Sequence, residues 1–383
     1  MKKILFISPR NPFSGRYSGD VVRAKKFVYF LSRDNYVKVI SPDKFDCKKK
    51  ESRLSYEGFS DTNLILKLFY IIFSLLKLKP LQLGYFYSSK INEYVKNNHK
   101  NYDLIFCQSF RTAQYIPENF SKKTILDMGD LTSNNYKQTS NRLYFFNPAK
   151  LIYYIESLLL KRYENFCFNK FHKILLFSKK EINTIKKKYK RKITQIYFGV
   201  DSIKKKYKFH VKNYKIIFIG NIKYTPNKSA CFEFANTILP LIFKVHPNIE
   251  FHIIGEISKF DKFFLQQKRN VKVIGKVNNL EPYIDKTICG LANLKISSGV
   301  QTKLLTYMSY GVPSVCSQQV ADNFDAIKES KINFYKNNKD LVKIILKLKN
   351  NKDFSLEASK RSLKIIQKFK WDRILTLFNK ILK

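Results

Sequence analysis

The sequence predicts an α/β protein made of two doubly wound domains, each with a parallel sheet between layers of helices. Three observations lead to this class. The chain has 383 residues, which is enough for two domains of ordinary size. Short apolar runs alternate with amphipathic segments along the first half, as in chains that form parallel sheets. The alternation begins again after a polar, Lys-rich stretch at 202–214.

Strands are expected in the first half where a short apolar run lacks helical spacing. The opening MKKILFISPR looks like a secretory signal for a few residues, but its apolar run is short and ends at Arg10. We therefore interpret 3–8 as the first strand. The other expected strands of this half are 37–40, 104–107, 124–127 and 174–177.

Helices of the first half are expected where apolar residues recur at helical spacing. Ala24, Phe27, Val28 and Leu31 are spaced i, i+3, i+4 and i+7, so a helix should follow Gly19. Further helices are expected at 64–78, at 151–168 and after the cap residue Ser178.

The second half repeats the pattern. Its expected strands are 216–219, 251–254, 271–274, 290–294 and 314–316. One helix should begin at Asn227 as its N-cap and be kinked by Pro240, and another should cover 301–310 and end at Gly311. The tail from Asp340 is predicted to be helical. The predicted parts are therefore a first domain at 1–201, a linker at 202–214, a second domain at 215–370 and a last helix at 371–383.

Composition narrows the function classes. The 72 Lys and Arg residues against 29 Asp and Glu residues give a formal charge of +43, which attracts anions. Disorder is excluded because 33 Phe and 24 Tyr residues need burial. A nucleic-acid binder is one hypothesis raised by the charge. The basic residues are spread along the chain and form no known RNA or DNA motif, so no specific nucleic acid is expected.

Cysteine spacing and hydropathy bear on the compartment. The six Cys residues lie far apart and form no C-x-x-C pair, so we expect buried, reduced thiols and a cytoplasmic protein. The apolar segment 64–78 contains Lys67 and Lys77 and is too short to cross a bilayer. It can lie in the membrane interface, and 179–192 is strongly basic. A peripheral site on an anionic membrane surface is therefore expected.

Three loops follow strands of the predicted sheets, where ligands of doubly wound domains bind. Gly19 lies in the first loop and would allow close approach to a helix N-terminus, although an ordinary turn has the same sequence. The second loop begins at Gly220 and contains Lys223 and Lys228, which either hold a diphosphate or reflect the abundance of Lys.

The third loop runs into the helix predicted at 301–310. Small and polar residues lead to Lys303, the third residue of that helix, and free N–H groups together with a lysine suit a phosphate. The candidate donor-binding residues of this segment are Ser298, Gly299, Val300, Gln301, Thr302, Lys303 and Thr306.

Four segments together resemble a bacterial glycosyltransferase of family 4, which has the GT-B fold. Residues 220–256, GNIKYTPNKSACFEFANTILPLIFKVHPNIEFHIIGE, resemble the opening of that family's second domain. Residues 297–315, SSGVQTKLLTYMSYGVPSV, are similar to its Gly-x-x-x-Lys-x-Leu-Glu-x-Met-x-x-Gly-x-Pro-x-Val run. Residues 9–23 and 126–136, the latter LDMGDLTSNNY, resemble an exopolysaccharide-associated subgroup.

The resemblance implies a retaining transfer of sugar from a nucleotide-sugar to a glycan or lipid-linked acceptor in surface glycan synthesis. Two Rossmann-like domains would face each other across a cleft, with the acceptor on the first and the donor on the second. The last helix would cross back to the first domain. Because the leaving group is a diphosphate, Lys303 is implied as the group that stabilises its charge, with Lys223 or Lys228 beside it.

Acidic residues complete the implied site. Asp127 and Asp130 follow the strand at 124–127 and are expected to face the cleft and orient the acceptor hydroxyl, or else to cap the next segment. No D-x-D triplet and no cluster with metal-ligand spacing occurs, so neither a metal nor another cofactor is expected. Glu156 and Glu164 are interpreted as part of a solvated helix face.

One departure from the family pattern leaves an alternative open. The family carries two glutamates eight residues apart, where this chain has Ser298 and Thr306. A hydroxyl forms a hydrogen bond but cannot act as a carboxylate. A catalytically silent GT-B partner protein therefore remains an alternative to the enzyme. A GT-B epimerase would need an acidic pair that the second domain lacks.

Overall fold

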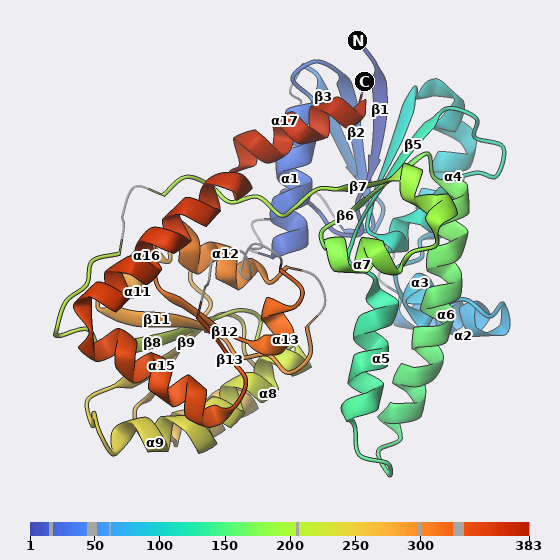
Figure 1. The fold of residues 1–383 in the computed structure, drawn as a ribbon. Helices are drawn as coiled ribbons and strands as arrows, with labels where there is room; N and C mark the ends of the chain where they lie inside the picture. Colours follow the sequence, from blue (N-terminus) through green and yellow to red (C-terminus); the bar gives the residue numbers. More distant parts are fainter. Residues whose placement is uncertain are drawn as a thin grey trace. The chain divides into compact units, whose positions relative to one another are not determined.

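In the computed structural model, the structure describes residues 1–14, 18–43, 52–60, 63–203, 207–297, 300–324 and 333–382. The chain divides into two compact units. The first comprises Met1–Tyr197 with Leu375–Lys383, and the second comprises Phe198–Ile374. Each unit contains a parallel sheet with helices on both faces (Figure 1). The described part of 202–214, the predicted linker, contains neither helix nor strand.

The first unit is built on a sheet of seven strands within the described residues, in the order β3-β2-β1-β4-β5-β6-β7. These strands are β1 (Lys3–Ile7), β2 (Tyr36–Ser41), β3 (Leu54–Gly58), β4 (Leu104–Gln108), β5 (Lys123–Gly129), β6 (Lys173–Leu176) and β7 (Ile193–Gln195). The five strands predicted for this half correspond to β1, β2, β4, β5 and β6. The edge strands β3 and β7 were not predicted, because LSYEG and ITQ lack a continuous apolar run.

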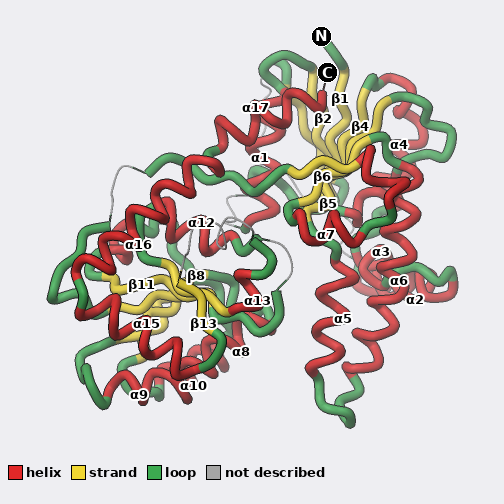
Figure 2. The backbone as a smooth tube through the Cα atoms, in the orientation of Figure 1, coloured by secondary structure: helices red, strands yellow, loops and turns green. Residues whose placement is uncertain are grey.

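Helices cover the two faces of this sheet. They are α1 (Gly19–Leu31), α2 (Leu64–Leu76), α3 (Leu81–Tyr85), α4 (Ser89–Asn98), α5 (Thr132–Arg142), α6 (Ala149–Lys170) and α7 (Lys179–Thr184). The predictions of α1, α2 and α6 are confirmed, as is the cap Ser178, whose hydroxyl accepts from the Glu181 amide at 3.4 Å. Figure 2 shows α5 and α6 as a helical hairpin that extends beyond the sheet of this unit.

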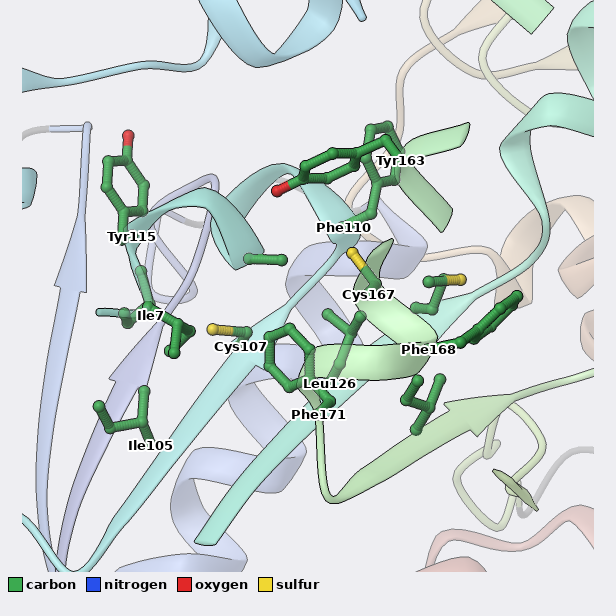
Figure 3. Packing of buried hydrophobic residues seen from close by; sticks show 14 of the residues in the cluster. Ile7, Ile105, Cys107, Phe110, Tyr115, Leu126, Tyr163, Cys167, Phe168 and Phe171 are labelled. Atoms are coloured by element: carbon green, nitrogen blue, oxygen red, sulfur yellow. The ribbon is translucent and has the colours of Figure 1, made fainter. Parts of the chain in front are cut away.

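The core of the first unit lies between the sheet and these helices. Figure 3 shows Ile105 and Cys107 of β4 and Leu126 of β5 in one buried cluster with Cys167 of α6 and with Phe171, the residue after that helix. The described cysteines are unpaired and buried, as predicted, and Cys47 lies outside the described residues. Burial raises the pKa of the Cys107 thiol to about 12, so the thiol stays neutral inside the core.

The second unit repeats the plan with six described strands in the order β10-β9-β8-β11-β12-β13. They are β8 (Lys215–Ile219), β9 (Glu250–Ile254), β10 (Val271–Gly275), β11 (Thr287–Ala292), β12 (Ser314–Ser317) and β13 (Asn333–Tyr335). The five predicted strands are confirmed, with the expected 290–294 shifted to β11. Among the described strands of this unit, only the edge strand β13 was missed.

The described helices of the second unit include all those predicted, together with three short helices, Lys259–Gln266, Glu281–Ile284 and Gln318–Ala321, that were not predicted. The described helices of this unit are α8 (Thr225–Glu233), α9 (Leu239–Phe243), α10 (Lys259–Gln266), α11 (Glu281–Ile284), α12 (Thr302–Ser309), α13 (Gln318–Ala321), α15 (Asn338–Asn350) and α16 (Lys352–Ile366). The last helix, α17 (Trp371–Leu382), begins in this unit and continues into the first. A π-helical turn at Phe234–Ile238 joins α8 to α9 directly before Pro240. Proline has no backbone N–H to donate, so the helix changes its hydrogen-bond register at the predicted position.

The last helix connects the two units along the chain. Its first residues belong to the second unit, and Leu375–Lys383 belongs to the first, as the predicted crossing requires. Phe378 is fully buried, with its ring 4.4 Å from that of Phe27 on α1 and 5.8 Å from that of Phe106 on β4. Lys123 of β5 donates to the Ile381 carbonyl at 2.8 Å and so satisfies one end of α17.

Removing this anchor should destabilise the first unit. Phe378→Ala is expected to lower the free energy of unfolding by about 3–5 kcal/mol, because it leaves a cavity against two buried aromatic rings. Leu377→Ala on the same helix is the matched control, since Leu377 is 38% exposed. Urea denaturation, combined with limited proteolysis of residues 1–197, measures the difference. Equal stability of the two variants would mean that α17 does not support the first unit.

Candidate functional site

The sheet of the second unit reverses its strand order between β8 and β11, and Tyr307 of α12 joins the ends of these strands. Its hydroxyl donates to the Leu291 carbonyl at 3.0 Å and accepts from the Ile219 amide at 2.8 Å. At Gly290 a Cβ atom would lie 2.3 Å from the Tyr307 ring, so glycine is what allows α12 to pack on β11. The helix therefore begins where ligands bind in sheets of this topology.

Lys303 is the charged group at this position. It is the second residue of α12, not the third as predicted, and it is 6% exposed. Its ammonium donates to Asn227 Oδ1 at 2.6 Å and lies 3.9 Å from the centre of the Phe218 ring. Among the described residues no carboxylate lies within ion-pairing distance of it. Burial lowers the pKa of Lys303 to about 7.

Gly220 and Asn227 complete the surroundings of this ammonium. Asn227 is not the N-cap of α8, as predicted, but its third residue, and Tyr224 is the N-cap. Its Nδ2 donates to the Asn221 carbonyl at 2.8 Å, which leaves Oδ1 for Lys303. A Cβ atom at Gly220 would lie 3.1 Å from Asn227 Nδ2 and 3.5 Å from Lys303 Nζ. The predicted residues Gly220 and Lys303 are therefore brought together.

The other two predicted lysines are paired with carboxylates. Lys223 Nζ lies 2.7 Å from Glu256 Oε1, and both side chains are about half exposed. Lys228 Nζ lies 2.5 Å from Asp261 Oδ1 on α10. The sequence places each lysine beside a candidate anion site, but each charge is already balanced by a carboxylate. Of the three lysines, Lys303 is thus the one that has no carboxylate partner among the described residues.

The segment before α12 is held by polar side chains. Ser298 and Gly299, two of the predicted donor-binding residues, lie outside the described residues. Val300 is buried, and Gln301 donates to Ser297 Oγ at 3.0 Å instead of capping the helix. Within the described residues, the first turn of α12 therefore has no side-chain cap, and its N–H groups point out at the helix end.

Thr306 and Thr302 lie on the outward side of α12. The Thr306 hydroxyl donates to the Thr302 carbonyl at 3.1 Å, one turn earlier. This bond is internal to the helix and leaves the hydroxyl oxygen able to accept a further hydrogen bond. Thr302 is exposed.

In the first unit, Arg23 and Asp127 form a fully satisfied buried ion pair. Arg23 of α1 donates through Nε to Asp127 Oδ2 at 2.6 Å and through Nη2 to Oδ1 at 2.9 Å, and it also donates to the Tyr197 carbonyl at 2.7 Å. Its guanidinium lies 4.5 Å from the centre of the Phe27 ring and 4.6 Å from that of Phe177. Asp127 is inside β5 and does not follow the strand, so the prediction that it orients the acceptor is corrected: it anchors α1 to the sheet.

Asp130 differs from Asp127 in what surrounds it. Its Oδ1 atom is buried and has no hydrogen-bond partner among the described residues, and the same is true of Glu181 Oε1. Burial raises the pKa of Asp130 to about 7, while Arg23 opposes the rise and Asp127 adds to it. Burial and the neighbouring Asp130 also raise the pKa of Glu181. Burying a carboxyl group without a hydrogen-bond partner lowers the stability of the fold, and such groups are often found at functional sites.

Two glutamates of α6 correct the prediction of a solvated face. Glu164 is 3% exposed and accepts from the Ser133 amide at 3.0 Å and the Ser133 hydroxyl at 2.6 Å. Glu156 is 2% exposed and accepts from the Leu81 amide at 2.9 Å. Both glutamates share the helix face of Leu160, so they receive the free N–H groups at the beginnings of α5 and α3.

Gly19 lies at the switch point of the first sheet, between β1 and β4. It is the first residue of α1, is half-buried, and follows residues 15–17, which lie outside the described residues. Beside it, Ser8 donates to Gln108 Oε1 at 2.6 Å, and Gln108 Nε2 donates to the Asp20 carbonyl at 2.5 Å. These bonds join the ends of β1 and β4 to the beginning of α1.

Several of these residues were missed from the sequence, and only some left a signal. Arg23 precedes Phe27 by one helical turn and so shares its buried face, and Glu164 follows Leu160 in the same way. Tyr307 lies on the buried stripe with Leu304. Glu181 gave no signal, because α7 is short and strongly polar.

A known protein family matches part of this chain by sequence, and solved structures match all of it by fold. Residues 213–351, a little over a third of the chain, match the model of a family described as "Glycosyl transferases group 1". These residues include Gly220, Asn227 and Lys303. A search of curated protein sequences finds no match.

Solved structures decide the fold. Sucrose-phosphate synthase from Thermosynechococcus elongatus superposes with a TM-score of 0.72 at 11% identity, over 100% of this chain and 98% of that one. HepE of Anabaena, solved with UDP-glucose, gives a TM-score of 0.67 at 13% identity, over 100% and 99%. TarM of S. aureus, in a complex that contains UDP, gives 0.65 at 12% identity, over 100% and 99%.

The chain has the GT-B fold. The predicted fold class of two parallel, Rossmann-like domains is therefore confirmed. At these identities the likeness extends to the fold and not to substrates. In the second of these domains, α12 begins beside the ends of β8 and β11, where the strand order of the sheet reverses. Lys303 is in the first turn of that helix.

The structural role of Asp127 can be tested with a double-mutant cycle. Arg23→Met is expected to lower the free energy of unfolding by about 3–5 kcal/mol, because it leaves a buried carboxylate without its partner. Asp127→Leu should lower the free energy of unfolding by a similar amount, because it leaves the buried Arg23 guanidinium without its partner. The double variant should be more stable than either single variant, measured by urea denaturation. Additive losses would show that the two side chains do not act as a pair.

Proposed function

We propose that this GT-B protein is a glycosyltransferase that moves a sugar from a nucleotide-sugar to a glycan or lipid-linked acceptor. The observation that carries the proposal is the burial of the Lys303 ammonium beside an uncapped helix N-terminus, with Asn227 as its polar partner and no carboxylate near it among the described residues. A buried cation is costly unless an anion compensates it, and a diphosphate would do so. The match of 213–351 to a glycosyltransferase family supports the same ligand.

The reaction needs charge stabilisation more than acid–base chemistry. The bond between the anomeric carbon and a diphosphate oxygen breaks, and its electron pair stays on the diphosphate. The acceptor oxygen bonds to the same carbon and gives up its proton. Protonated Lys303 and the first N–H groups of α12 would stabilise the charge that develops on the leaving group. Retention of the anomeric configuration is included in the proposal because of the resemblance to family 4.

We assign to Asp130 the role of accepting the hydrogen bond, and then the proton, of the acceptor hydroxyl. Its Oδ1 has no hydrogen-bond partner among the described residues, and its pKa of about 7 suits a group that accepts a proton or a hydrogen bond near neutral pH. Asp127 does not share this role, because both of its oxygens are bonded to Arg23.

UDP-sugars are the first donors to test, because the structures of HepE and TarM were determined with UDP-glucose and with UDP. A role in exopolysaccharide or other surface glycan synthesis is part of the proposal and is supported by the resemblance of 126–136 to the exopolysaccharide-associated subgroup.

A catalytically silent partner protein is the second candidate function. The observation that favours it is Thr306, which carries a hydroxyl where the family has a carboxylate and uses its hydrogen within α12. The two candidates differ in turnover. Hydrolysis or transfer of UDP-glucose above the background rate would exclude the silent partner, and UDP binding without turnover of any nucleotide-sugar would favour it.

The role of Lys303 predicts a characteristic pH dependence. The pKa of Lys303 lies at about 7 in the protein without ligand, so at higher pH the amine is mostly neutral. Binding of a diphosphate then requires the amine to take up a proton. UDP affinity should therefore fall with rising pH, by up to about tenfold per unit above pH 7. Lys303→Ala should bind UDP more weakly at pH 7 and lose this dependence, as measured by isothermal titration. Lys262→Ala, an exposed lysine on α10, is the control. An unchanged affinity and pH profile in Lys303→Ala would refute the assignment.

Asp130→Asn should separate stability from function. The folded state raises the pKa of this carboxyl from 3.8 to about 7, so folding retains a proton that the unfolded chain loses, and stability falls as pH rises through that window. The variant should therefore melt at a higher temperature than the native protein at pH 8 and at a similar temperature at pH 4. It should lose most transfer activity while it retains UDP binding. Asp34→Asn, at an exposed position, should change neither property. Full activity in Asp130→Asn would remove Asp130 from the site.

A further inference from the structure

The first unit has a helix whose apolar face is left uncovered. In α2, Ser74 is the buried residue, whereas Leu64, Ile65 and Leu76 are 71%, 77% and 77% exposed. Other large apolar side chains of the same segment are also exposed: Leu68, Phe69, Ile72, Phe73, Leu75 and Leu78. Soluble monomers rarely present an apolar surface of this extent without a partner for it.

The tip of the α5–α6 hairpin is a second uncovered apolar element. Tyr144, Phe145 and Phe146 lie in the loop between the helices and are 84%, 83% and 89% exposed. Leu151 and Ile152, at the beginning of α6, are also exposed. Figures 1 and 2 show this loop at the far end of the hairpin, away from the sheet of the same unit.

The two elements are linked through α6. Glu156 of α6 accepts from the backbone amides of Leu81 and Gln82, at the beginning of α3, which directly follows α2. The first half of α6, which begins at the hairpin tip, is therefore bonded to the segment that follows the end of α2.

The chain segments that form α2 and the hairpin tip carry charges of one sign. Neither 63–92 nor 131–155 contains an Asp or Glu residue, and both contain Lys or Arg. Lys77 lies over the Phe73 ring at 4.1 Å and Lys67 over the Tyr85 ring at 5.5 Å, so their stems follow apolar surface while their ammonium groups stay accessible.

A basic hollow adjoins the end of α2. It has a volume of about 520 Å³ and is lined by Lys77 and Lys79 after α2, Lys96 of α4, and Arg162 and Lys170 of α6. Glu118 is the acidic residue of its described lining. The size and charge of the hollow suit a phosphate group and its immediate substituents.

We propose that α2 and the tip of the α5–α6 hairpin dock this protein on an anionic phospholipid membrane, with the basic hollow receiving lipid phosphates. Amphipathic elements with apolar and basic residues bind at the headgroup boundary, and each basic residue near an anionic surface adds to the attraction. No helix in the described ranges is long and apolar enough to span a bilayer. The sequence indicated the apolar segment 64–78 and the basic segment 179–192. The hairpin tip and the basic hollow are additions from the structure.

A second copy of the chain is the less suitable occupant. Self-association through this surface would bring two predominantly basic surfaces together in a chain that carries a charge of +43. An anionic bilayer complements both the apolar and the basic part. The proposal does not depend on transferase activity.

Vesicle co-sedimentation of the full chain tests the proposal. The native protein should bind vesicles of phosphatidylcholine with phosphatidylglycerol and not vesicles of phosphatidylcholine alone. Leu68→Ser/Phe69→Ser/Ile72→Ser in α2, and separately Phe145→Ser/Phe146→Ser in the hairpin, should each weaken binding by about tenfold or more. Phe260→Ser/Phe263→Ser is the matched control, because these phenylalanines of α10 are 69% and 59% exposed but belong to the second unit.

Charge variants test the hollow in the same way. Lys77→Gln/Lys79→Gln/Arg162→Gln should reduce binding to anionic vesicles by about tenfold, whereas Lys343→Gln/Lys360→Gln/Lys364→Gln, at exposed positions of the second unit, should not. All variants should bind UDP as the native protein does, so failure here is distinguishable from failure of the proposed function.

Three results would overturn the proposal. The native protein could remain in the supernatant with both vesicle types at low salt. The α2, hairpin and charge variants could bind like the native protein. Light scattering could show a native dimer that the α2 and hairpin variants disrupt, without vesicle binding, in which case this surface joins two copies of the chain.

Discussion

The burial of the Lys303 ammonium is the physical constraint on which the function of the second unit depends. Tyr307 packs α12 against Gly290, and this contact draws the beginning of the helix over the ends of β8 and β11. The same packing removes Lys303 from water and leaves it with Asn227 and the Phe218 ring. Neither partner supplies a full negative charge, so an anionic ligand would gain energy that a surface lysine could not offer.

The first unit shows how differently two neighbouring aspartates can be used. Arg23 bonds both oxygens of Asp127, so this pair holds α1 on the sheet and has little left to offer a substrate. Asp130, three residues later, keeps an oxygen without a partner among the described residues and titrates near neutrality. A fold tolerates such a residue at a cost in stability, and functional sites are where that cost is usually found.

The sequence was most informative where one physical rule decides the structure. Continuous apolar runs identified the central strands, helical spacing identified α1, and Gly311 marked the end of the helix that contains Lys303. Edge strands such as β3 and β13 were missed, because their residues are not buried on both faces. Gly220 and Lys303 were predicted as partners in one site, but the carboxylates that neutralise Lys223 and Lys228 come from later segments of the chain. Spacing along the chain cannot show such tertiary pairs, and for the same reason Arg23 was not assigned to Asp127.

The most direct measurement is a crystal structure of the protein with UDP bound. The account predicts a diphosphate oxygen within hydrogen-bond distance of Lys303 Nζ, with the first N–H groups of α12 directed at the phosphates and Gly220 close to them. UDP bound elsewhere on the chain, with the Lys303–Asn227 bond unchanged and no phosphate near either residue, would contradict it.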